Sequence, residues 1–255
     1  MPPPPSIANR LLAALAPKDL DVLRAQLEPV PLPHKQTLSH PGVPIEHVYF
    51  VEEGMVSLVQ PLQGGMIEVG MIGKEGFLGV PVLLGADTSP LEAMVQIPGS
   101  ALRIEANAFR EEVGRSTALS GLLLRYAQAL QVQVSVSAAC NGRHALSERL
   151  ARWLLTARDR APSDELPLGH EFLSMMLGVR RAGVTVALGT LRSAGLIRNT
   201  HGRVTIIDRY GLEAASCECY RIVRREYERL FAQERIAIVL PRLPFRGLDV
   251  FCSEA

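Results

Sequence analysis

The segment from His170 to Leu191 restricts the fold more than any other part of the 255-residue chain, because it has the pattern of two short helices joined by a tight turn. Apolar residues with helical spacing precede and follow Gly178: Leu173, Met176 and Leu177, then Val184, Leu188 and Leu191. Gly178 is expected to end the first helix. Two helices that each bury one stripe across so short a turn must cross steeply, which predicts a helix-turn-helix.

The second predicted helix carries side chains that suit the major groove of DNA. Between its buried positions lie Arg180, Arg181, Ala182, Thr185 and Val186. Arginine can bind guanine through two hydrogen bonds, and small apolar or Thr side chains can contact a thymine methyl group. These residues are therefore predicted to contact DNA, whereas an ordinary αα-hairpin within a helical domain is the alternative interpretation.

Two short β-branched runs follow directly, at residues 197–199 and 203–207, around a turn that contains Gly202. This pattern predicts a β-hairpin, and a helix-turn-helix followed by a hairpin is a winged helix. Between Leu166 and Ile207 the chain has one acid, Glu171, and five arginines: Arg180, Arg181, Arg192, Arg198 and Arg203. Local positive charge favours binding to phosphates, although the net charge of the chain is only +1. His201 and Arg203 in the wing are expected to join the DNA contacts.

Between residues 30 and 104 the sequence consists of short strand-forming runs separated by turn residues. The predicted strands cover 36–38, 48–51, 55–59, 67–72, 93–97 and 100–104, with breaks at 40–42, 53–54, 63–65, 73–76 and 98–99. Strands of this length and spacing predict an antiparallel β-roll, similar to a jelly roll, which encloses a small ligand or packs solid. Two short helices between residues 6 and 27 are expected to cap it.

Residues 116–141 have the pattern of one long helix with an apolar stripe. The stripe consists of Leu119, Leu122, Leu123, Tyr126, Leu130 and Val134. A helix of this length exceeds what the small β-roll can cover, so pairing with the same helix of a second copy is predicted, with these residues in the dimer interface. A dimer would place two recognition helices about one DNA turn apart. A helix packed within one subunit is the alternative.

The predicted fold class is α+β, with an N-terminal antiparallel β-roll, a long dimerisation helix and a C-terminal winged helix-turn-helix. The corresponding boundaries are 1–115, 116–141 and 142–232, and residues 233–255 have no clear pattern. Further helices are expected over 145–160 and, capped by Asp208, over about 211–232. No run of apolar residues is long enough for a transmembrane helix, and the proline-rich start lacks the features of a signal peptide, so a cytoplasmic location is expected.

The residues that could support metal chemistry are too dispersed to predict a site. Four cysteines, at 140, 217, 219 and 252, do not form a disulfide scaffold, and Cys217 and Cys219 could hold a metal only with partners from elsewhere. His34, His40 and His47 lack the close spacing of a metal-dependent oxygenase. No P-loop, dinucleotide fingerprint or Gly-x-Ser-x-Gly motif is present, so neither catalysis nor a metal or cofactor is expected.

The order of β-roll, long helix, short helix and winged helix resembles that of the Crp/Fnr family of bacterial transcription regulators. Four segments carry the resemblance, which extends to about Phe231: residues 40–42, 48–56, 73–79 and 177–191. It implies a β-roll like that of cyclic nucleotide-binding domains, dimerisation through the long helix, and Arg181 in the position of the family's usual base-contacting arginine. The expected partners are double-stranded DNA, a second copy of the chain and RNA polymerase, with no membrane.

By this resemblance the ligand pocket contains Gly79, Val80, Leu91, Glu92 and Ala93. Val80 stands where cyclic nucleotide binders have a glutamate for the ribose hydroxyl, and Leu91 and Glu92 stand where an arginine and a Ser or Thr hold the cyclic phosphate. A carboxylate without a fixed cation repels phosphate, so cyclic AMP and cyclic GMP are not expected as ligands. The effector, if the β-roll has one, is expected to be uncharged or apolar.

Two further departures concern other branches of the family. The iron–sulfur branch has cysteines near the N-terminus, whereas the first cysteine here is Cys140, so oxygen sensing through such a cluster is not expected. In the recognition helix Ala182 and Val186 replace a family glutamate and a second arginine, which predicts a different operator sequence. A DNA-binding regulator is the leading hypothesis. A ligand-binding or adaptor module that uses its winged helix for protein contacts is the second, and a metalloenzyme is the third.

Overall fold

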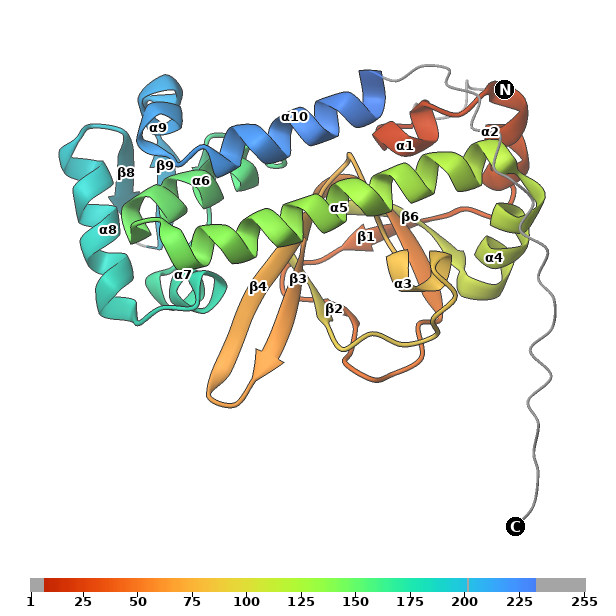
Figure 1. Cartoon of the computed structure of the whole chain (residues 1–255), viewed down its shortest axis with the longest axis horizontal. Coiled ribbons are helices and arrows are strands. Elements are labelled where there is room, and N and C mark those ends of the chain that lie inside the picture. Colours follow the sequence, from red (N-terminus) through yellow and green to blue (C-terminus); the bar gives the residue numbers. More distant parts are fainter. Residues whose placement is uncertain (1–6, 201, 233–255) are drawn as a thin grey trace, which may run out of the picture.

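The computed structural model describes residues 7–200 and 202–232, so the predicted contact residue His201 and the segment 233–255 lie outside the described residues. The N-terminal part contains α1 (Arg10–Ala13), α2 (Pro17–Arg24), β1 (Glu28–Leu32), β2 (Thr37–Ser39), β3 (His47–Leu62), β4 (Gly65–Ile72), β5 (Phe77–Leu78), α3 (Val80–Leu83), β6 (Glu92–Glu105) and α4 (Ala106–Arg115). The C-terminal part contains α5 (Thr117–Arg143), α6 (Leu146–Arg158), β7 (Glu165–Leu166), α7 (His170–Leu177), α8 (Arg181–Ser193), β8 (Ile197–Thr200), β9 (Arg203–Ile206), α9 (Arg209–Ala215) and α10 (Cys219–Ala232). Figure 1 shows the β-roll beneath the long helix α5 and the winged helix at one end of the molecule. This is the predicted α+β architecture.

The β-roll is antiparallel, with the strand order β1-β6-β3-β4, and β2 and β5 pair with β6 and β3. Two predicted breaks, at residues 53–54 and 98–99, are wrong because β3 and β6 each continue through them. The pairing register of β3 with β6 shifts there, and Gly54 has a φ of +88°. A Cβ atom on Gly99 would collide with the Glu53 carbonyl, so these glycines allow a bulge in strands that bend without ending.

The edge strand β1 was not predicted from the sequence, because Pro29 and Pro31 interrupt the strand pattern. Proline cannot donate a backbone hydrogen bond, so it is tolerated on edge strands, and β1 pairs only with β6. The two predicted N-terminal helices are present as α1 and α2. Asn9 caps α1, accepting hydrogen bonds from the backbone nitrogens of Leu11 and Leu12.

The long helix α5 is present, but its apolar stripe is buried within its own chain. Leu123 and Tyr126 are fully buried, and the Tyr126 ring lies 5.1 Å from that of Phe77, between ring centroids. Five of the six predicted interface residues belong to this core: Leu119, Leu122, Leu123, Tyr126 and Leu130. Val134 is half-buried. The five core side chains are buried within their own chain, which corrects the predicted dimer interface at those positions, and the role of Val134 stays a prediction.

Helix α10 covers part of α5, which was not predicted from the sequence. It runs antiparallel to α5 (Figure 1) and adds Val223, Tyr227 and Leu230 to the core of the β-roll. The single helix predicted over about 211–232 is therefore two helices, with an extended break at Ser216. Asp208 does cap the first of them, because its carboxylate accepts a hydrogen bond from the Gly211 nitrogen at 2.9 Å. At its far end α10 returns to the N-terminal helices, where the Arg10 guanidinium lies 3.9 Å from the Phe231 ring centroid.

The winged helix has the predicted form. Gly178 ends α7 in the left-handed conformation, with a φ of +64°, and α8 follows at an angle of 104°. The wing is a small sheet in the order β7-β9-β8. Among the described residues, no single helix has the length and apolar character needed to cross a membrane; only α7 and α8 together reach that length, and they are bent at this turn.

Candidate functional site

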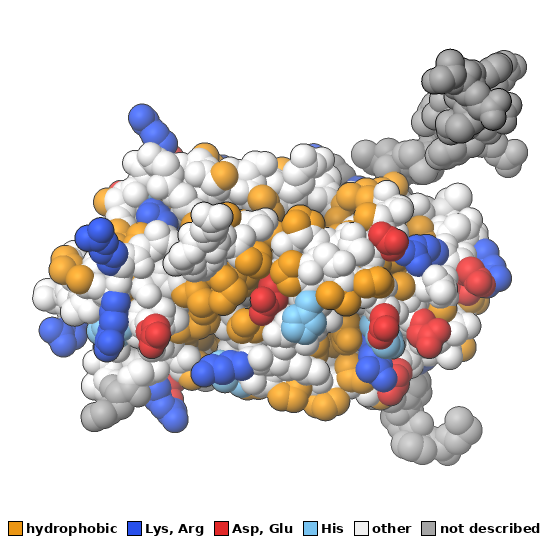
Figure 2. Space-filling view, turned by 90° about the horizontal axis from the view of Figure 1, so that it is seen from below, with side chains coloured by type: hydrophobic (Ala, Val, Ile, Leu, Met, Phe, Trp, Pro, Cys, Tyr) orange, Lys and Arg blue, Asp and Glu red, His pale blue; other side chains and the backbone are white. Residues whose placement is uncertain are grey.

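The predicted DNA-contacting arginines lie at the exposed start of α8. Arg180 is the N-cap residue and Arg181 begins the helix. Arg181, Ala182 and Val186 are exposed. Val186 is 70% exposed although its side chain is apolar. Within the described part of the chain, neither arginine forms an ion pair. Figure 2 shows that Lys and Arg side chains prevail at the end of the molecule formed by the winged helix, on the left. This surface therefore combines unpaired cations with exposed apolar groups.

Thr185 takes part in a hydrogen-bond network that the sequence did not predict. Its hydroxyl donates to the Arg181 carbonyl at 3.2 Å and lies 3.0 Å from His170 Nδ1. The other ring nitrogen, Nε2, lies 2.9 Å from the Asn199 side-chain nitrogen. Because Asn199 donates to Nε2, His170 carries its proton on Nδ1 and donates it to Thr185. The network joins α7, α8 and β8, and so fixes the recognition helix relative to the wing.

Arg203, predicted to contact DNA from the wing, forms an ion pair with Glu165 of β7. Both side chains are exposed, at 63% and 48%. An exposed ion pair contributes little to stability, and a phosphate can accept the same charge-assisted hydrogen bonds. A DNA backbone can therefore compete with Glu165 for this guanidinium.

The predicted ligand pocket corresponds to a small cavity in the β-roll. Gly79, Val80, Leu91 and Ala93 line it, together with Leu130 of α5. Glu92 does not, because its carboxylate accepts a hydrogen bond from the Thr37 hydroxyl at 3.3 Å. This corrects one of the five predicted pocket residues.

The character of this cavity is apolar, and its volume is only about 50 Å³. Sites for drug-sized ligands have volumes of about 300–1,000 Å³. Among the described residues that line it, the only polar side chains are Ser39, His47 and Ser89, and none is an arginine, lysine or carboxylate. A cyclic phosphate would find neither space nor a fixed cation there. Since Leu130 belongs to α5, a small apolar occupant would contact the long helix directly.

Two buried carboxylates of the β-roll, one bound to α6 and one to the turn directly after it, form what we call the domain junction. At the first, Trp153 Nε1 donates to Glu68 at 2.7 Å, and the Ser57 hydroxyl donates to the other oxygen of the same carboxylate. Burial is the main influence on the Glu68 carboxyl and raises its pKa to about 7. The hydrogen bonds from Ser57 and Trp153 act in the opposite direction and lower the pKa. This group therefore titrates near neutral pH at a contact between the two domains.

The second contact of the domain junction is the ion pair of Glu75 with Arg160. Glu75 Oε1 accepts hydrogen bonds from Arg160 Nη2 at 2.6 Å and from Nε at 2.9 Å. The two side chains are only 10% and 7% exposed. The same carboxylate oxygen accepts a bond from the Gly73 nitrogen, which holds the turn between β4 and β5 in place. Neither partner was predicted from the sequence, because 85 residues separate them.

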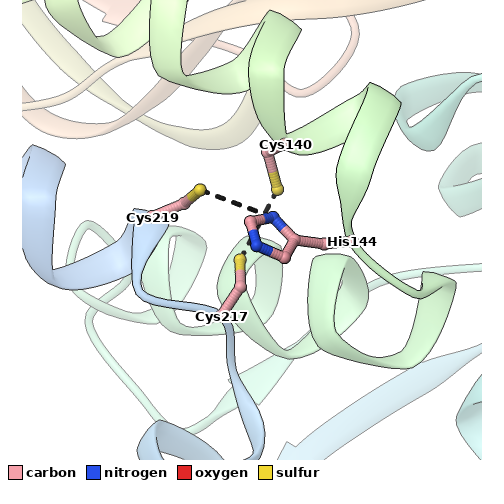
Figure 3. Close-up of side chains that lie close together, drawn as sticks. All are labelled: Cys140, His144, Cys217 and Cys219. Atoms are coloured by element: carbon pink, nitrogen blue, oxygen red, sulfur yellow. Dashed lines mark hydrogen bonds between the residues drawn. The ribbon is translucent and has the colours of Figure 1, made fainter.

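A cluster of three cysteines and one histidine lies where α5 ends and α10 begins (Figure 3). Cys140 is in the last turn of α5 and His144 is its C-cap residue, whereas Cys217 lies in the connection between α9 and α10 and Cys219 is the first residue of α10. The four donor atoms all lie within 4.8 Å of one another, and the Cys140 and Cys217 sulfurs are 3.5 Å apart. Hydrogen bonding to Cys217 lowers the pKa of the Cys140 thiol and raises that of Cys217. The pair Cys217 and Cys219 was noted in the sequence as able to hold a metal with partners from elsewhere, whereas the spacing of Cys140 and His144, one helical turn, is a local signal that was not used.

The fold and these surfaces define a transcription regulator in which a β-roll of the cyclic nucleotide-binding type is joined by a long helix to a winged helix-turn-helix. Residues 29–116 match the cyclic nucleotide-binding domain, and residues 148–215 match the Crp-like helix-turn-helix domain. The chain belongs to the Crp/Fnr family.

Two curated relatives are proteins called global nitrogen regulator. The one from Synechocystis sp. is 26% identical over 181 residues, covering 67% of this chain and 80% of the relative. The one from Nostoc sp. is also 26% identical, covering 67% and 81%. At this identity they are distant relatives of the chain.

Solved structures show the same fold. FixK2 from Bradyrhizobium japonicum has a TM-score of 0.64 at 18% identity and covers 75% of this chain and 98% of its own. A CRP-family transcriptional regulator from Thermus thermophilus has a TM-score of 0.61 at 23% identity, covering 73% and 96%. At these identities the likeness concerns the fold alone.

Proposed function

We propose that the protein is a homodimeric regulator that recognises a specific DNA sequence through α8. The observation that carries this proposal is the pair of exposed, unpaired arginines at the start of α8, next to the exposed methyl groups of Ala182 and Val186. Arginine at a recognition-helix N-terminus can read guanine in the major groove, and methyl groups favour thymine. The His170 network supports this role, because base reading needs a helix held in a fixed orientation.

Arg181→Ala is expected to weaken binding to the protein's own upstream DNA by about 1–3 kcal/mol, which is the discrimination that one bidentate arginine–guanine contact supplies. Binding to scrambled DNA should change much less. Fluorescence anisotropy with both duplexes at one fixed salt concentration measures the difference. Equal losses on the two duplexes would disprove the base-reading role of Arg181.

Arg203→Ala is the matched control for that experiment, since it removes a guanidinium from the wing instead of from the recognition helix. It should weaken both duplexes alike and reduce the salt dependence of binding, as expected for loss of one phosphate contact. A loss confined to the upstream DNA would instead place Arg203 among the base-reading side chains.

The dimer interface that we propose is the exposed face of α5, not its buried stripe. The residues of this face follow one another at alternating spacings of four and three: Leu124, Gln128, Gln131, Ser135 and Ala138. Such spacing keeps one face of a helix toward a partner helix, as in a coiled coil. Leu124 is its exposed apolar member, at 38%.

Leu124→Glu should therefore weaken dimerisation at least about tenfold, because two like charges would meet across the symmetric interface. Sedimentation velocity over a concentration series measures this change. Val22→Glu, which replaces an exposed aliphatic residue of α2, is the control and should leave the dimer unchanged. If both variants dimerise like the unaltered protein, the second copy does not pack on this face of α5.

We further propose that the β-roll senses a small uncharged or apolar molecule, or no ligand at all, and that cyclic AMP is not its effector. The support is the apolar lining of the 50 Å³ cavity, including Val80 and Leu91. Millimolar cyclic AMP is expected to change neither the melting temperature nor the affinity for upstream DNA. A ligand present at a hundred times its Kd would add about 2.7 kcal/mol to the stability, so a clear upward shift of the melting temperature would refute this interpretation.

A further inference from the structure

The Cys140, His144, Cys217 and Cys219 side chains have the donor atoms and the separations of a single-metal site. Three sulfurs and one imidazole nitrogen lie within 4.8 Å of one another, with separations of 3.5 Å between the Cys140 and Cys217 sulfurs and 3.6 Å between Cys219 Sγ and His144 Nδ1. With Zn–S bonds of about 2.3 Å and Zn–N bonds of about 2.0 Å, the edges of a tetrahedral site measure roughly 3.8 Å between two sulfurs and roughly 3.5 Å between a sulfur and a nitrogen. These two separations are within about 0.3 Å of those edges.

The environment of His144 provides an independent observation. While Nδ1 points toward the Cys219 sulfur, the opposite nitrogen, Nε2, lies 3.2 Å from the Glu218 carboxylate. Imidazoles that bind metal through one nitrogen usually donate the hydrogen of the other to a carboxylate, which fixes the ring and makes it a stronger ligand. Glu218 therefore stands in the position of an outer partner of a metal-bound histidine.

The charges around the cluster favour an anionic complex. Arg149 and Arg152 of α6 are only 8% and 7% exposed, and both lie close enough to the cysteines to interact with them electrostatically. Neither forms an ion pair with a carboxylate in the described part of the chain, and the Nε atoms of both lack a hydrogen-bond partner. Buried cations require compensating negative charge. A divalent cation bound by three thiolates and a neutral imidazole has a net charge of −1 and supplies it.

The donor set also distinguishes among metals. Thiolates and imidazole in a closed tetrahedron are the ligands of structural zinc, whereas Ca²⁺ and Mg²⁺ take oxygen ligands. The ligands of an iron–sulfur cluster bind different irons and so surround a polynuclear core, whereas these four donor atoms all lie within 4.8 Å of one another, as around a single ion. Cys140 and His144, spaced by one helical turn, and the pair Cys217 and Cys219 supply two ligands each, from segments 73 residues apart.

We propose that Cys140, His144, Cys217 and Cys219 form a structural site for one Zn²⁺ ion per chain. The ion joins the C-terminal end of α5 to the start of α10, at the place where the chain passes from the long helix into the winged helix and back. Metal binding at such a site contributes directly to the free energy of folding, since the unfolded chain does not hold the four ligands together. It fixes the recognition domain to α5 independently of DNA binding.

The test is metal analysis of the full-length protein, purified under reducing conditions without chelators. We expect about one zinc per chain by inductively coupled plasma mass spectrometry. The protein reconstituted with Co²⁺ should show the intense visible bands and the thiolate charge-transfer absorption of a tetrahedral cobalt–thiolate site. Cys140→Ser and Cys217→Ser should reduce the zinc content to background, whereas Cys252→Ser, which replaces the one cysteine that is not among the proposed ligands, is the control and should leave it unchanged.

Two further variants keep the test decisive if a Ser variant fails to fold. His144→Cys preserves four ligands and should retain one zinc, with a cobalt spectrum shifted toward that of four thiolates. Glu218→Gln keeps all ligands and should weaken zinc affinity by about 10–100-fold. The proposal is overturned if the unaltered protein holds no more zinc than Cys140→Ser after reconstitution. It is equally overturned if mass spectrometry finds Cys140 and Cys217 joined as a disulfide in protein prepared without oxygen.

Discussion

Arg160→Met is expected to lower the free energy of unfolding by about 3–5 kcal/mol, the cost of removing one partner from a buried ion pair. The Glu75 carboxylate, 10% exposed, would lose two hydrogen bonds at once, at 2.6 and 2.9 Å. Methionine fills a similar volume, so the loss reflects the unpaired charge more than a cavity. Urea denaturation followed by the fluorescence of Trp153 measures the effect, because this residue is the only tryptophan of the chain and lies at the domain junction.

Two variants separate the loss of charge pairing from other effects of the Arg160 substitution. The double variant Glu75→Gln with Arg160→Met removes both charges and should recover much of the lost stability. Arg103→Met, which breaks the exposed pair with Glu28, should have a far smaller effect because water already screens that pair. If Arg160→Met were no more destabilising than Arg103→Met, the buried pair would not stabilise the domain junction.

Glu68→Gln is expected to stabilise the protein at pH 8 by an amount of the order of 3 kcal/mol. The Glu68 pKa is about 7 in the folded protein, compared with an ordinary value of 4.5. The folded state therefore binds the proton more tightly than the unfolded state, and the stability of the unaltered protein falls as the pH rises from about 4.5 to about 7. Glutamine is neutral at every pH, and it can accept from Trp153 and donate to Ser57, so it avoids this loss.

The measurement is the free energy of unfolding of both proteins between pH 5 and pH 8. The two should be of similar stability at the acidic end, and the difference should grow with pH and level off above about 7. A Glu68→Gln protein that is less stable than the unaltered one at pH 8 would contradict this prediction. It would show that Arg152 and Arg160, the nearby cations that lower the Glu68 pKa, favour the ionised carboxylate by more than its burial disfavours it. The carboxylate would then be stabilising.

The parts of the fold that were predicted from the sequence depend on local patterns. The helix-turn-helix follows from apolar spacing on both sides of Gly178, and the wing follows from β-branched runs around Gly202. By contrast, Gly54 and Pro98-Gly99 were interpreted as ends of strands because the same residues occur in turns and in bulges. Which of the two they form depends on the neighbouring strand, which lies more than 40 residues away.

The errors in the candidate sites arise from contacts between distant segments. The stripe of α5 correctly predicted a covered helix, but α10 covers part of it, about 100 residues later in the chain, in place of a second subunit. Cys217 and Cys219 were expected to hold a metal only with partners from elsewhere in the chain, and these partners could not be named; the return of the chain along α5 brings the Cys140 and Cys217 sulfurs to 3.5 Å. Glu92 was predicted to line the pocket from its position in the sequence, but its side chain accepts a hydrogen bond from Thr37 and does not line the cavity. Local spacing contains no information on such pairings.

The course of α5 and α10 also determines how the recognition domain is attached. These two helices form an antiparallel helical hairpin (Figure 1), and residues 145–216 occupy the position of its connecting loop. The chain leaves α5 after His144 and re-enters at Cys217, and the donor atoms of these residues lie within 4.8 Å. Topologically, the recognition domain is an insertion whose two connections to the rest of the chain lie side by side. An insertion of this kind can be replaced by another domain whose two ends are equally close. The DNA sequence that is recognised can then change, while the hairpin of α5 and α10 and the β-roll beneath it keep their connectivity.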